Sequence, residues 1–447
     1  MSEKEITERI MEDDEIHKKG GEVSPALISI HPLEESIAVA IGSELRVFDL
    51  VGTKPVVLHD HAGGPSHSDS IRSICFGAKG TLFASAGDDK LVKIWKVDSW
   101  KCIRTVSSEK RVTAVSISHD GLFVCLADKF GVVWVVDLNS QGENQCPVDK
   151  SASPLLGHYC SIITSLEFSP DGRFIVSADR DFKIRITVFP KKPLKGAHEI
   201  QSFCLGHTDF VSCLAFAFST DDSSQGFLLS GGGDSTVRLW DYLSGSLLDT
   251  CDIGSKLACN GDKSKVKEDG CSVVTDLCVC HNGSLVSVSV QSFHGVILLN
   301  CNLIAKTLSF SMAIPIVGNF IPTSMATGNN SDHLWMVMGA SGLPSADPNV
   351  MYPVRVKVIA GLKKFHSDIE VQNLSILKDD DIPGSKDSLM VLQGSLDVEK
   401  DEDSLVHTAE ALKTAMRNLL IKRQYSVEKR EVRKKSRNDR KLKRKVV

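Results

Sequence analysis

The sequence predicts an all-β protein, a β-propeller of seven four-stranded blades followed by a helical, basic C-terminal tail. Two observations favour this fold. A segment recurs along the chain with an average period of about 47 residues, which is the length of one propeller blade. Within the copies, the same polar residue types return at the same distance from the end of the segment.

Three strong copies establish the register. They begin near His67, His158 and His207, and they close at Trp95, at Thr187 and at the pair Trp240-Asp241. Each copy has a serine ten residues before its closing position and an aspartate six residues before it. Weaker copies occupy residues 25–50, 112–137 and 272–300, and a last unit lies roughly between residues 310 and 360. The number of blades therefore reaches seven.

The recurring polar residues are typical of WD repeats, and we interpret them as structural. A tryptophan, a serine, a histidine and an aspartate can form a buried hydrogen-bonded chain that holds a loop against its sheet, since buried polar groups need partners. A Ser-His-Asp set resembles a nucleophile triad, but this one returns with the blade period, and a hydrolase needs only one. The predicted blade network comprises His67, Ser85, Asp89, Trp95, His158, Ser177, Asp181, His207, Ser230, Asp234 and Trp240.

Composition divides the chain into four parts. Residues 1–20 form an acidic N-terminal segment, and residues 21–365 form the WD40 propeller. Residues 366–403 are expected to be a flexible acidic linker, because nine acidic residues between 379 and 403 face only Lys386 and Lys400. Residues 404–447 combine an amphipathic helix, whose apolar residues recur every three or four positions, with a basic tail.

The tail carries a strong positive charge. Residues 422–447 contain thirteen lysines and arginines against three acidic residues, whereas the whole chain has a net charge of −4. Such a cluster is typical of a nuclear localisation signal or of a contact with nucleic-acid phosphates, and a merely solvated tail is the third interpretation. We expect nuclear localisation. The candidate tRNA or import residues are Lys434, Lys435, Arg437, Arg440, Lys441, Lys443, Arg444 and Lys445.

The sequence lacks the local signatures of common enzymes. It contains no Walker A loop, no HExxH pair and no GxSxG elbow. The thirteen cysteines show no CxxC pairs of the kind that bind zinc, no apolar run is long enough to span a bilayer, and the first residues have no apolar export signal. We therefore expect reduced thiols, no catalytic residues, no metal and no cofactor, as in a binding platform.

Two strings give a more specific resemblance. SPDGRFIVSADRDFKIRITVFP (169–190) and IQSFCLGHTDFVSCLAF (200–216) resemble the non-catalytic WD-repeat subunit of the eukaryotic tRNA (guanine-N(7)-)-methyltransferase. The resemblance covers residues 21–365 and is strongest from 157 to 241. It implies a heterodimer in which a separate catalytic subunit binds S-adenosylmethionine and methylates a guanine of the tRNA variable loop. This chain would bind and stabilise that subunit and would meet tRNA mainly through the complex.

The resemblance also implies a partner-binding site. Lys183 and Arg185 are two residues apart on a predicted strand and so share a face. In the family, basic residues of this strand pair with acidic residues of the catalytic subunit, a role that we assign to Lys183, Arg185 and Arg180. The alternative is an ion pair within the propeller to Asp179 or Asp181. Phe182 departs from the family pattern, in which an acidic residue is common.

A different class of function remains open at this stage. A WD-repeat scaffold of unrelated function, such as a substrate receptor for a ubiquitin ligase or a ribosome-assembly factor, would show the same repeats. A receptor of the cullin type is expected to have an arginine two residues after a Trp-Asp pair, and here Trp240-Asp241 is followed by Tyr242-Leu243. A cryptic enzyme assembled from distant loops is the third hypothesis.

Overall fold

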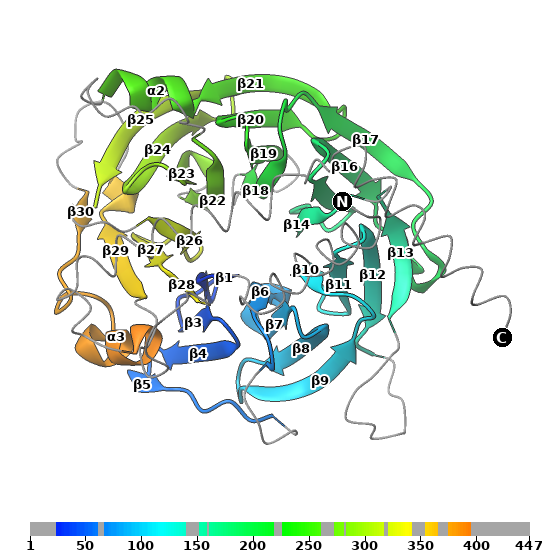
Figure 1. The fold of residues 1–447 in the computed structure, drawn as a ribbon, viewed down its shortest axis with the longest axis horizontal. Coiled ribbons are helices and arrows are strands. Elements are labelled where there is room, and N and C mark those ends of the chain that lie inside the picture. Colours follow the sequence, from blue (N-terminus) through cyan, green and yellow to red (C-terminus); the bar gives the residue numbers. More distant parts are fainter. Residues whose placement is uncertain are drawn as a thin grey trace, which may run out of the picture.

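A computed structural model describes the chain in ten ranges: residues 24–60, 67–139, 152–158, 161–218, 226–260, 272–280, 283–316, 321–341, 354–364 and 374–394. Seven four-stranded antiparallel sheets are arranged as the blades of a ring (Figure 1). The prediction of a seven-bladed propeller is confirmed. Residues 1–20 and the predicted helix and tail of residues 404–447 lie outside the described residues.

In each blade the strands follow one another from the centre of the ring to its rim. Blade 1 consists of β2 (Leu27–Ile30), β3 (Ser36–Ile41), β4 (Glu44–Asp49) and β5 (Lys54–Pro55). Blade 2 consists of β6 (Ile71–Gly77), β7 (Leu82–Gly87), β8 (Leu91–Lys96) and β9 (Lys101–Ser107). Blade 3 consists of β10 (Val112–Ile117), β11 (Phe123–Asp128), β12 (Val132–Asp137) and β13 (Ser153–Gly157). Blade 4 consists of β14 (Ile163–Phe168), β15 (Phe174–Asp179), β16 (Lys183–Val188) and β17 (Ile200–Leu205). Blade 5 consists of β18 (Val211–Phe218), β19 (Gly226–Gly232), β20 (Thr236–Asp241) and β21 (Ser246–Asp252).

Blades 6 and 7 complete the ring. Blade 6 consists of β22 (Val274–Cys280), β23 (Leu285–Val290), β24 (Gly295–Asn302) and β25 (Thr307–Pro315). Blade 7 consists of β26 (Pro322–Ala326), β27 (His333–Met338), β29 (Arg355–Ala360) and β30 (Ser375–Ile376). Short helical segments connect or follow the strands: η1 (Ala78–Gly80), η2 (Pro193–Lys195), α2 (Ile253–Asn260), η4 (Leu362–Lys364) and α3 (Ser385–Gln393). Within these residues no helix is long and apolar enough to cross a membrane.

The hydrophobic core lies between neighbouring blades. Second strands such as β15 are buried along their whole length, because one face packs on the preceding blade and the other on the following blade. This double burial explains why these strands are rich in β-branched and small residues rather than alternating in polarity. The turn between the second and third strand requires a left-handed residue, which is Phe182 in blade 4 (φ 70°), Gly131 in blade 3 and Ser235 in blade 5.

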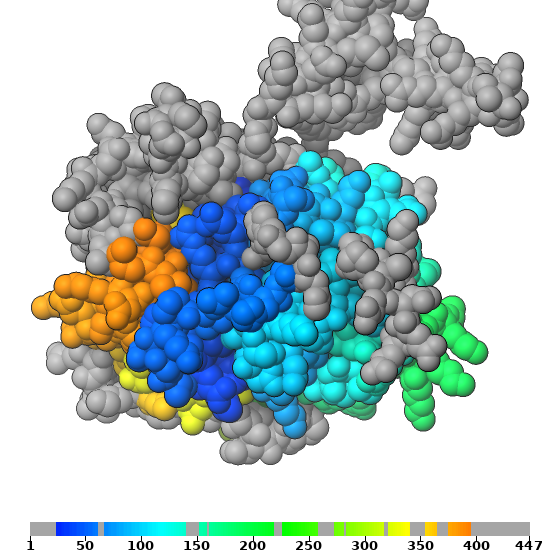
Figure 2. All heavy atoms as spheres, turned by 90° about the horizontal axis from the view of Figure 1, so that it is seen from below, coloured from blue at the N-terminus to red at the C-terminus, as the bar shows by residue number. Residues whose placement is uncertain are grey.

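The ring closes between blade 7 and blade 1. The short strand β1 (Ser24–Pro25) pairs with β28 (Ala340–Ser341), and the Thr323 hydroxyl of β26 donates to the Ala26 carbonyl at 2.7 Å. Helix α3 packs against β4, β5 and β29, and Figure 2 shows its orange residues beside the blue residues of blade 1. Ile382, Leu389 and Leu392 are buried in this contact.

Two predicted boundaries are therefore wrong. The propeller does not end at residue 365, because β30 supplies the outer strand of blade 7. Residues 374–394, which fall within the predicted flexible linker 366–403, are ordered: Asp379 accepts from Arg355 at 3.0 Å and from Lys357 at 2.8 Å, and α3 follows it. An acid-rich composition does not indicate disorder here, because Asp379 neutralises the buried Arg355 and the partly buried Lys357, and the apolar residues of this stretch pack into the core.

Candidate protein-binding site on blade 4

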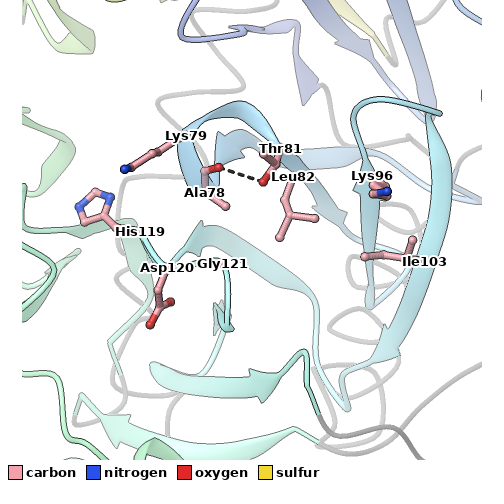
Figure 3. A pocket seen from close by; sticks show the side chains of 9 residues that line it. All are labelled: Ala78, Lys79, Thr81, Leu82, Lys96, Ile103, His119, Asp120 and Gly121. Atoms are coloured by element: carbon pink, nitrogen blue, oxygen red, sulfur yellow. Dashed lines mark hydrogen bonds between the residues drawn. The ribbon is translucent and has the colours of Figure 1, made fainter.

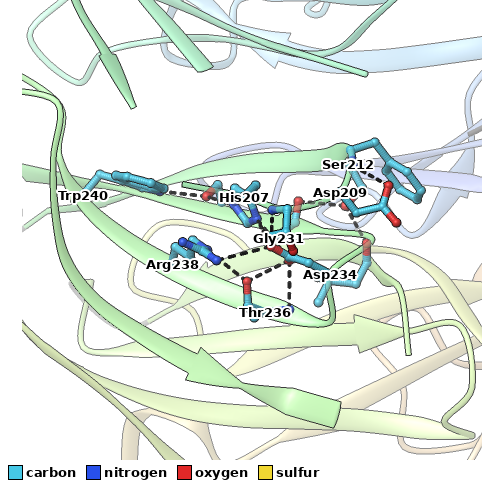
Figure 4. A network of polar contacts seen from close by, with 12 residues as sticks. His207, Asp209, Ser212, Gly231, Asp234, Thr236, Arg238 and Trp240 are labelled. Carbon is cyan, nitrogen blue, oxygen red and sulfur yellow. Dashed lines mark hydrogen bonds and ion pairs between the residues drawn. The ribbon is translucent and has the colours of Figure 1, made fainter. Parts of the chain in front are cut away.

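The polar network of blades 2 and 5 has the predicted composition. In blade 5 the Nδ1 of His207 donates to Asp234 at 2.9 Å, the Ser230 hydroxyl donates to Nε2 at 2.7 Å, and Trp240 Nε1 donates to the same hydroxyl oxygen at 2.8 Å (Figure 4). A carboxylate only accepts, so this tautomer of the histidine satisfies every group in the chain. Burial alone would raise the pKa of Asp234, but the hydrogen bonds that it accepts from His207, from the Thr208 backbone and from Thr236 hold it well below its usual range.

Blade 2 repeats the arrangement. His67 bonds to Asp89 at 2.8 Å and to Ser85 at 2.9 Å, and Trp95 Nε1 donates to Ser85 at 3.1 Å. Burial would raise the pKa of Asp89, yet its bond to His67 lowers it. These side chains are buried between strands and have all of their partners within one blade, so their geometry fits a structural role.

In blade 4 the acid of the network is not the predicted one. His158 bonds to Ser177 at 2.7 Å but donates to Asp179 at 2.8 Å rather than to Asp181. Asp179 is the last residue of β15, at the ladder position that Gly87 and Gly232 occupy in blades 2 and 5. Its carboxylate therefore bonds to the histidine of blade 4, as the turn aspartates of blades 2 and 5 bond to theirs. The register of the repeats pointed to Asp181, but the signal that identifies Asp179 is an acidic residue at a glycine position.

Blade 4 also lacks the closing tryptophan. Thr187 stands there, completely buried, and its hydroxyl oxygen has no hydrogen-bond partner among the residues that the structure describes. Lys183 and Arg185 lie on the same face of β16 as Thr187, as the two-residue spacing predicts. The Lys183 side chain is exposed. Arg185 is half-buried, and its Nη1 donates to the Gly157 carbonyl of blade 3 at 3.1 Å.

The cation of blade 4 differs from its counterparts in other blades. Lys93 and Arg238 occupy the ladder position of Arg185, opposite a serine of the second strand. Lys93 forms an ion pair with Asp60, and Arg238 pairs with Asp234 at 3.4 Å. Within the described ranges Arg185 has no carboxylate partner, its Nε is buried without a hydrogen bond, and burial lowers its pKa.

Arg180 lies in the turn before β16. Its backbone N–H donates to the Ile162 carbonyl at 3.0 Å; burial lowers the pKa of its side chain, while the charge of Asp181 opposes that shift. No ion pair joins Lys183 or Arg185 to Asp179 or Asp181 in the described part of the chain. The Phe182 side chain is 42% exposed and does not pack inward.

A pocket of about 500 Å³ lies at the other end of the strands, between turns of blades 2 and 3 (Figure 3). Its polar groups hold the turns themselves: His119 Nε2 donates to the Ser169 carbonyl at 2.7 Å, Asp120 accepts from Ser118 at 2.5 Å, and Lys96 pairs with Asp98. These contacts give the pocket no reactive group placed for catalysis, so the blade 4 surface is the stronger candidate site.

The fold and the repeated network define a WD-repeat β-propeller. Solved propellers agree at the level of fold: U3-55K has a TM-score of 0.57 at 18% identity and covers 76% of this chain and 96% of that one, and the RRP9 WD40 repeats have a TM-score of 0.55 at 18% identity, covering 71% and 88%. Residues 62–96 match the general WD domain, G-beta repeat.

More specific matches follow from the sequence. Residues 139–340 match the family model of the tRNA methyltransferase TRM82 WD40 domain. Relatives named tRNA (guanine-N(7)-)-methyltransferase non-catalytic subunit include those of Dictyostelium discoideum (32% identity, 52% of this chain and 50% of the relative), Homo sapiens (36%, 42% and 42%) and Xenopus laevis (29%, 72% and 77%). The first two alignments span half or less of the relatives' length. The chain is thus related to these non-catalytic WD-repeat subunits, and the predicted resemblance is confirmed.

Proposed function

We propose that this chain is the non-catalytic subunit of a tRNA guanine-N(7) methyltransferase, which binds and stabilises a separate catalytic subunit as a heterodimer. The names of the relatives support this function over an unrelated WD-repeat scaffold. Methyl transfer from S-adenosylmethionine would take place on the catalytic subunit, and tRNA would be bound mainly by the complex.

One observation carries the assignment of the binding surface. Arg185 is partly desolvated and has no carboxylate partner among the residues that the structure describes, although the cations at the same position in blades 2 and 5 each have one. A cation held in this way favours an anion from another molecule, since a buried charge without a partner is costly. Lys183 extends the charge along the same face, and Arg180 adds to it from the turn. A carboxylate of the catalytic subunit would complete this arrangement.

The test is co-expression with the catalytic subunit, followed by tRNA methylation assays with each chain alone and with both. We expect full activity only with both. The double variant Lys183→Glu with Arg185→Glu is expected to weaken binding at least about 30-fold, because loss of a desolvated charge pair costs about 2 kcal/mol or more. Its matched control is Lys191→Glu with Lys192→Glu, which reverses two exposed charges at the opposite end of blade 4.

Equal binding by the charge-reversed protein and its control would remove Lys183 and Arg185 from the site. Failure of the unaltered chain both to pair with the catalytic subunit and to affect its activity would contradict the proposed function itself.

The basic tail has a separate proposed role. Its thirteen cations suit nuclear import or a salt-dependent contact with the tRNA backbone. We expect removal of residues 422–447 to leave the heterodimer intact but to reduce nuclear accumulation of a fluorescent fusion or the affinity of the complex for tRNA. Loss of pairing with the catalytic subunit after this truncation would show that the tail belongs to the protein interface.

A further inference from the structure

The outer strand of blade 4 exposes a row of large apolar side chains. Ile200, Phe203 and Leu205 of β17 are 43%, 42% and 62% exposed, and we refer to these three residues as the apolar stripe. Single exposed apolar residues are common on protein surfaces. Three on one short strand form a contiguous patch of the kind that marks an interaction site.

The apolar stripe lies directly beside the cations. Across the β16–β17 ladder Lys183 faces Leu205, Arg185 faces Phe203, and Thr187 faces Ile200. Residues opposite each other in an antiparallel pair have their side chains on the same face, about 5 Å apart. The apolar stripe and the cations therefore form one continuous surface. Beneath it lie two buried polar atoms that have no hydrogen-bond partner among the described residues, the Nε of Arg185 and the hydroxyl oxygen of Thr187.

The same ladder positions are polar in other blades. Opposite the third-strand cation, blade 2 has Thr105 and blade 5 has Thr250, where blade 4 has Phe203. Two residues further along the strand, blade 2 has Ser107 where blade 4 has Leu205. The propeller fold thus tolerates small polar residues at these positions, so the fold does not require the apolar side chains of blade 4.

In the part of the chain that the structure describes, the open face of blade 4 has no cover like that of blade 2. In blade 2 the segment that enters the blade pairs with the outer strand through a bridge between His59 and Lys101, and its Asp60 neutralises Lys93. In the described part of blade 4 no comparable segment supplies a carboxylate to Arg185. The contacts that blade 2 satisfies internally are therefore available at blade 4 to a second molecule that brings both an acid and apolar groups.

We infer that the apolar stripe and the two cations, Lys183 and Arg185, together bind one segment of the catalytic methyltransferase subunit, which places carboxylates on the cations and apolar side chains on Phe203 and Leu205. The inference rests on the proposed function and extends it, because it assigns the interface a hydrophobic half that the charged residues alone do not provide. Charge complementarity selects the occupant: the surface combines positive charge with apolar area, and residues 1–421 of the chain are otherwise strongly acidic.

The charged half of this interface, Lys183 and Arg185, and its apolar half, Phe203 and Leu205, should contribute to binding in ways that depend differently on salt concentration. Ionic contacts at a surface weaken as salt is added, because counterions screen them. Burial of apolar area is not weakened by salt in this way. A binding isotherm measured for the full-length chain and the catalytic subunit at several NaCl concentrations therefore separates the contribution of Phe203 and Leu205 from that of Lys183 and Arg185.

The key variant is Phe203→Thr with Leu205→Ser, which installs the residue types that blade 2 has at these ladder positions. We expect binding at least 10-fold weaker at every salt concentration, with the salt dependence of the unaltered chain preserved. The Lys183→Glu, Arg185→Glu variant is expected to reverse that salt dependence, because added salt screens the repulsion between the new glutamates and the carboxylates of the catalytic subunit. Ile103→Ser is the matched control, since Ile103 is a 47% exposed residue on the equivalent outer strand β9 and is expected to leave binding unchanged.

Thermal melts of each variant establish that the propeller is folded, and the two single variants are measured if the double variant melts early. Binding by Phe203→Thr with Leu205→Ser that equals the Ile103→Ser control would overturn the inference, while the proposed function would stand if charge reversal still weakened pairing. If the unaltered chain does not bind the catalytic subunit, the inference and the proposed function both fail.

Discussion

At the scale of single residues, the same polar chain is built from different positions in different blades. In blade 4 the Asp179 carboxylate accepts a hydrogen bond from the His158 ring. It also accepts from the backbone N–H groups of Asp181 at 2.8 Å and Lys183 at 3.1 Å. Asp181 lies in the turn and takes no part in the histidine network. The two acids, separated by one residue, are therefore expected to contribute very differently to stability.

Asp179→Ala is expected to lower the free energy of unfolding by about 1–3 kcal/mol, because it leaves buried donors of His158 and of the turn without an acceptor. Asp181→Ala is expected to lower it by less than Asp179→Ala does, because the His158 ring bonds to Asp179 and not to Asp181. Urea unfolding of both variants measures the difference. A larger effect for Asp181→Ala would restore the role that the sequence register predicts for it.

The sequence predicts individual residues well where a position repeats. His67, His207 and the two closing tryptophans were identifiable because each returns with the blade period. The apolar stripe cannot be identified from the sequence. An apolar residue of an outer strand has the same sequence pattern whether its side chain packs on a neighbouring blade or is exposed to solvent. The exposure of Phe203 depends on how blades 3 and 4 pack against each other at the rim, which is a property of tertiary structure.

At the scale of secondary-structure elements, helix α3 shows how a local composition can mislead. Its sequence lies in an acid-rich stretch beside Pro383 and Gly384, features that favour a linker. Nevertheless Leu389 and Leu392, three residues apart on one side of the helix, are fully buried against blades 1 and 7. The amide oxygen of Gln393 accepts from the Val356 backbone at 3.0 Å, which ties the end of the helix to β29.

Helix α3 is therefore expected to stabilise the closure of the ring. Leu389→Ala and Leu392→Ala should each lower the free energy of unfolding by about 2–5 kcal/mol, the usual cost of removing a buried leucine side chain. Met390→Ala is the control within the same helix, since Met390 is 47% exposed. Chemical denaturation provides the values. Equal, small effects at all three positions would mean that residues 385–393 behave as the linker that composition predicts.

At the scale of the whole molecule, two carboxyl groups face unfavourable surroundings on inner strands of the ring. Burial, with a smaller contribution from the charge of Asp276, raises the pKa of Glu167 on β14 to about 8. Burial also raises the pKa of Asp276 on β22 to about 6, although its carboxylate accepts from the backbone N–H groups of Met325 at 2.7 Å and Leu277 at 2.9 Å. The two strands belong to blades 4 and 6 and are brought near each other only by ring formation.

Architecture at this scale follows from the repeat, but these pKa shifts do not. Seven copies of a blade-length segment predict seven blades around an axis. The interaction between Glu167 and Asp276 requires knowing which inner-strand side chains point toward each other across blades, and that depends on the register of β14 and β22. Both residues are unremarkable acids when the sequence is read one repeat at a time.

The raised pKa of Glu167 makes the stability of the propeller dependent on pH. Between its usual pKa of about 4.3 and the folded value of about 8, the folded chain keeps a proton that the unfolded chain releases. Stability contributed by this proton is complete below about pH 4 and is lost as pH rises through 8. Glutamine has no such proton to release, so the free energy of unfolding of Glu167→Gln should exceed that of the unaltered chain by an amount that grows between about pH 4 and pH 8.

Urea unfolding of both proteins from pH 5 to 9 measures this difference, with Glu199→Gln, at an exposed position, as the control for loss of a carboxyl group elsewhere. The free-energy gap between Glu167→Gln and the unaltered chain should widen from pH 5 to about pH 8 and then level off, whereas the control should show no such gap. A constant gap would mean that the Glu167 carboxyl ionises as easily in the ring as in the unfolded chain, so that the inner strands present a well-solvated surface at this position.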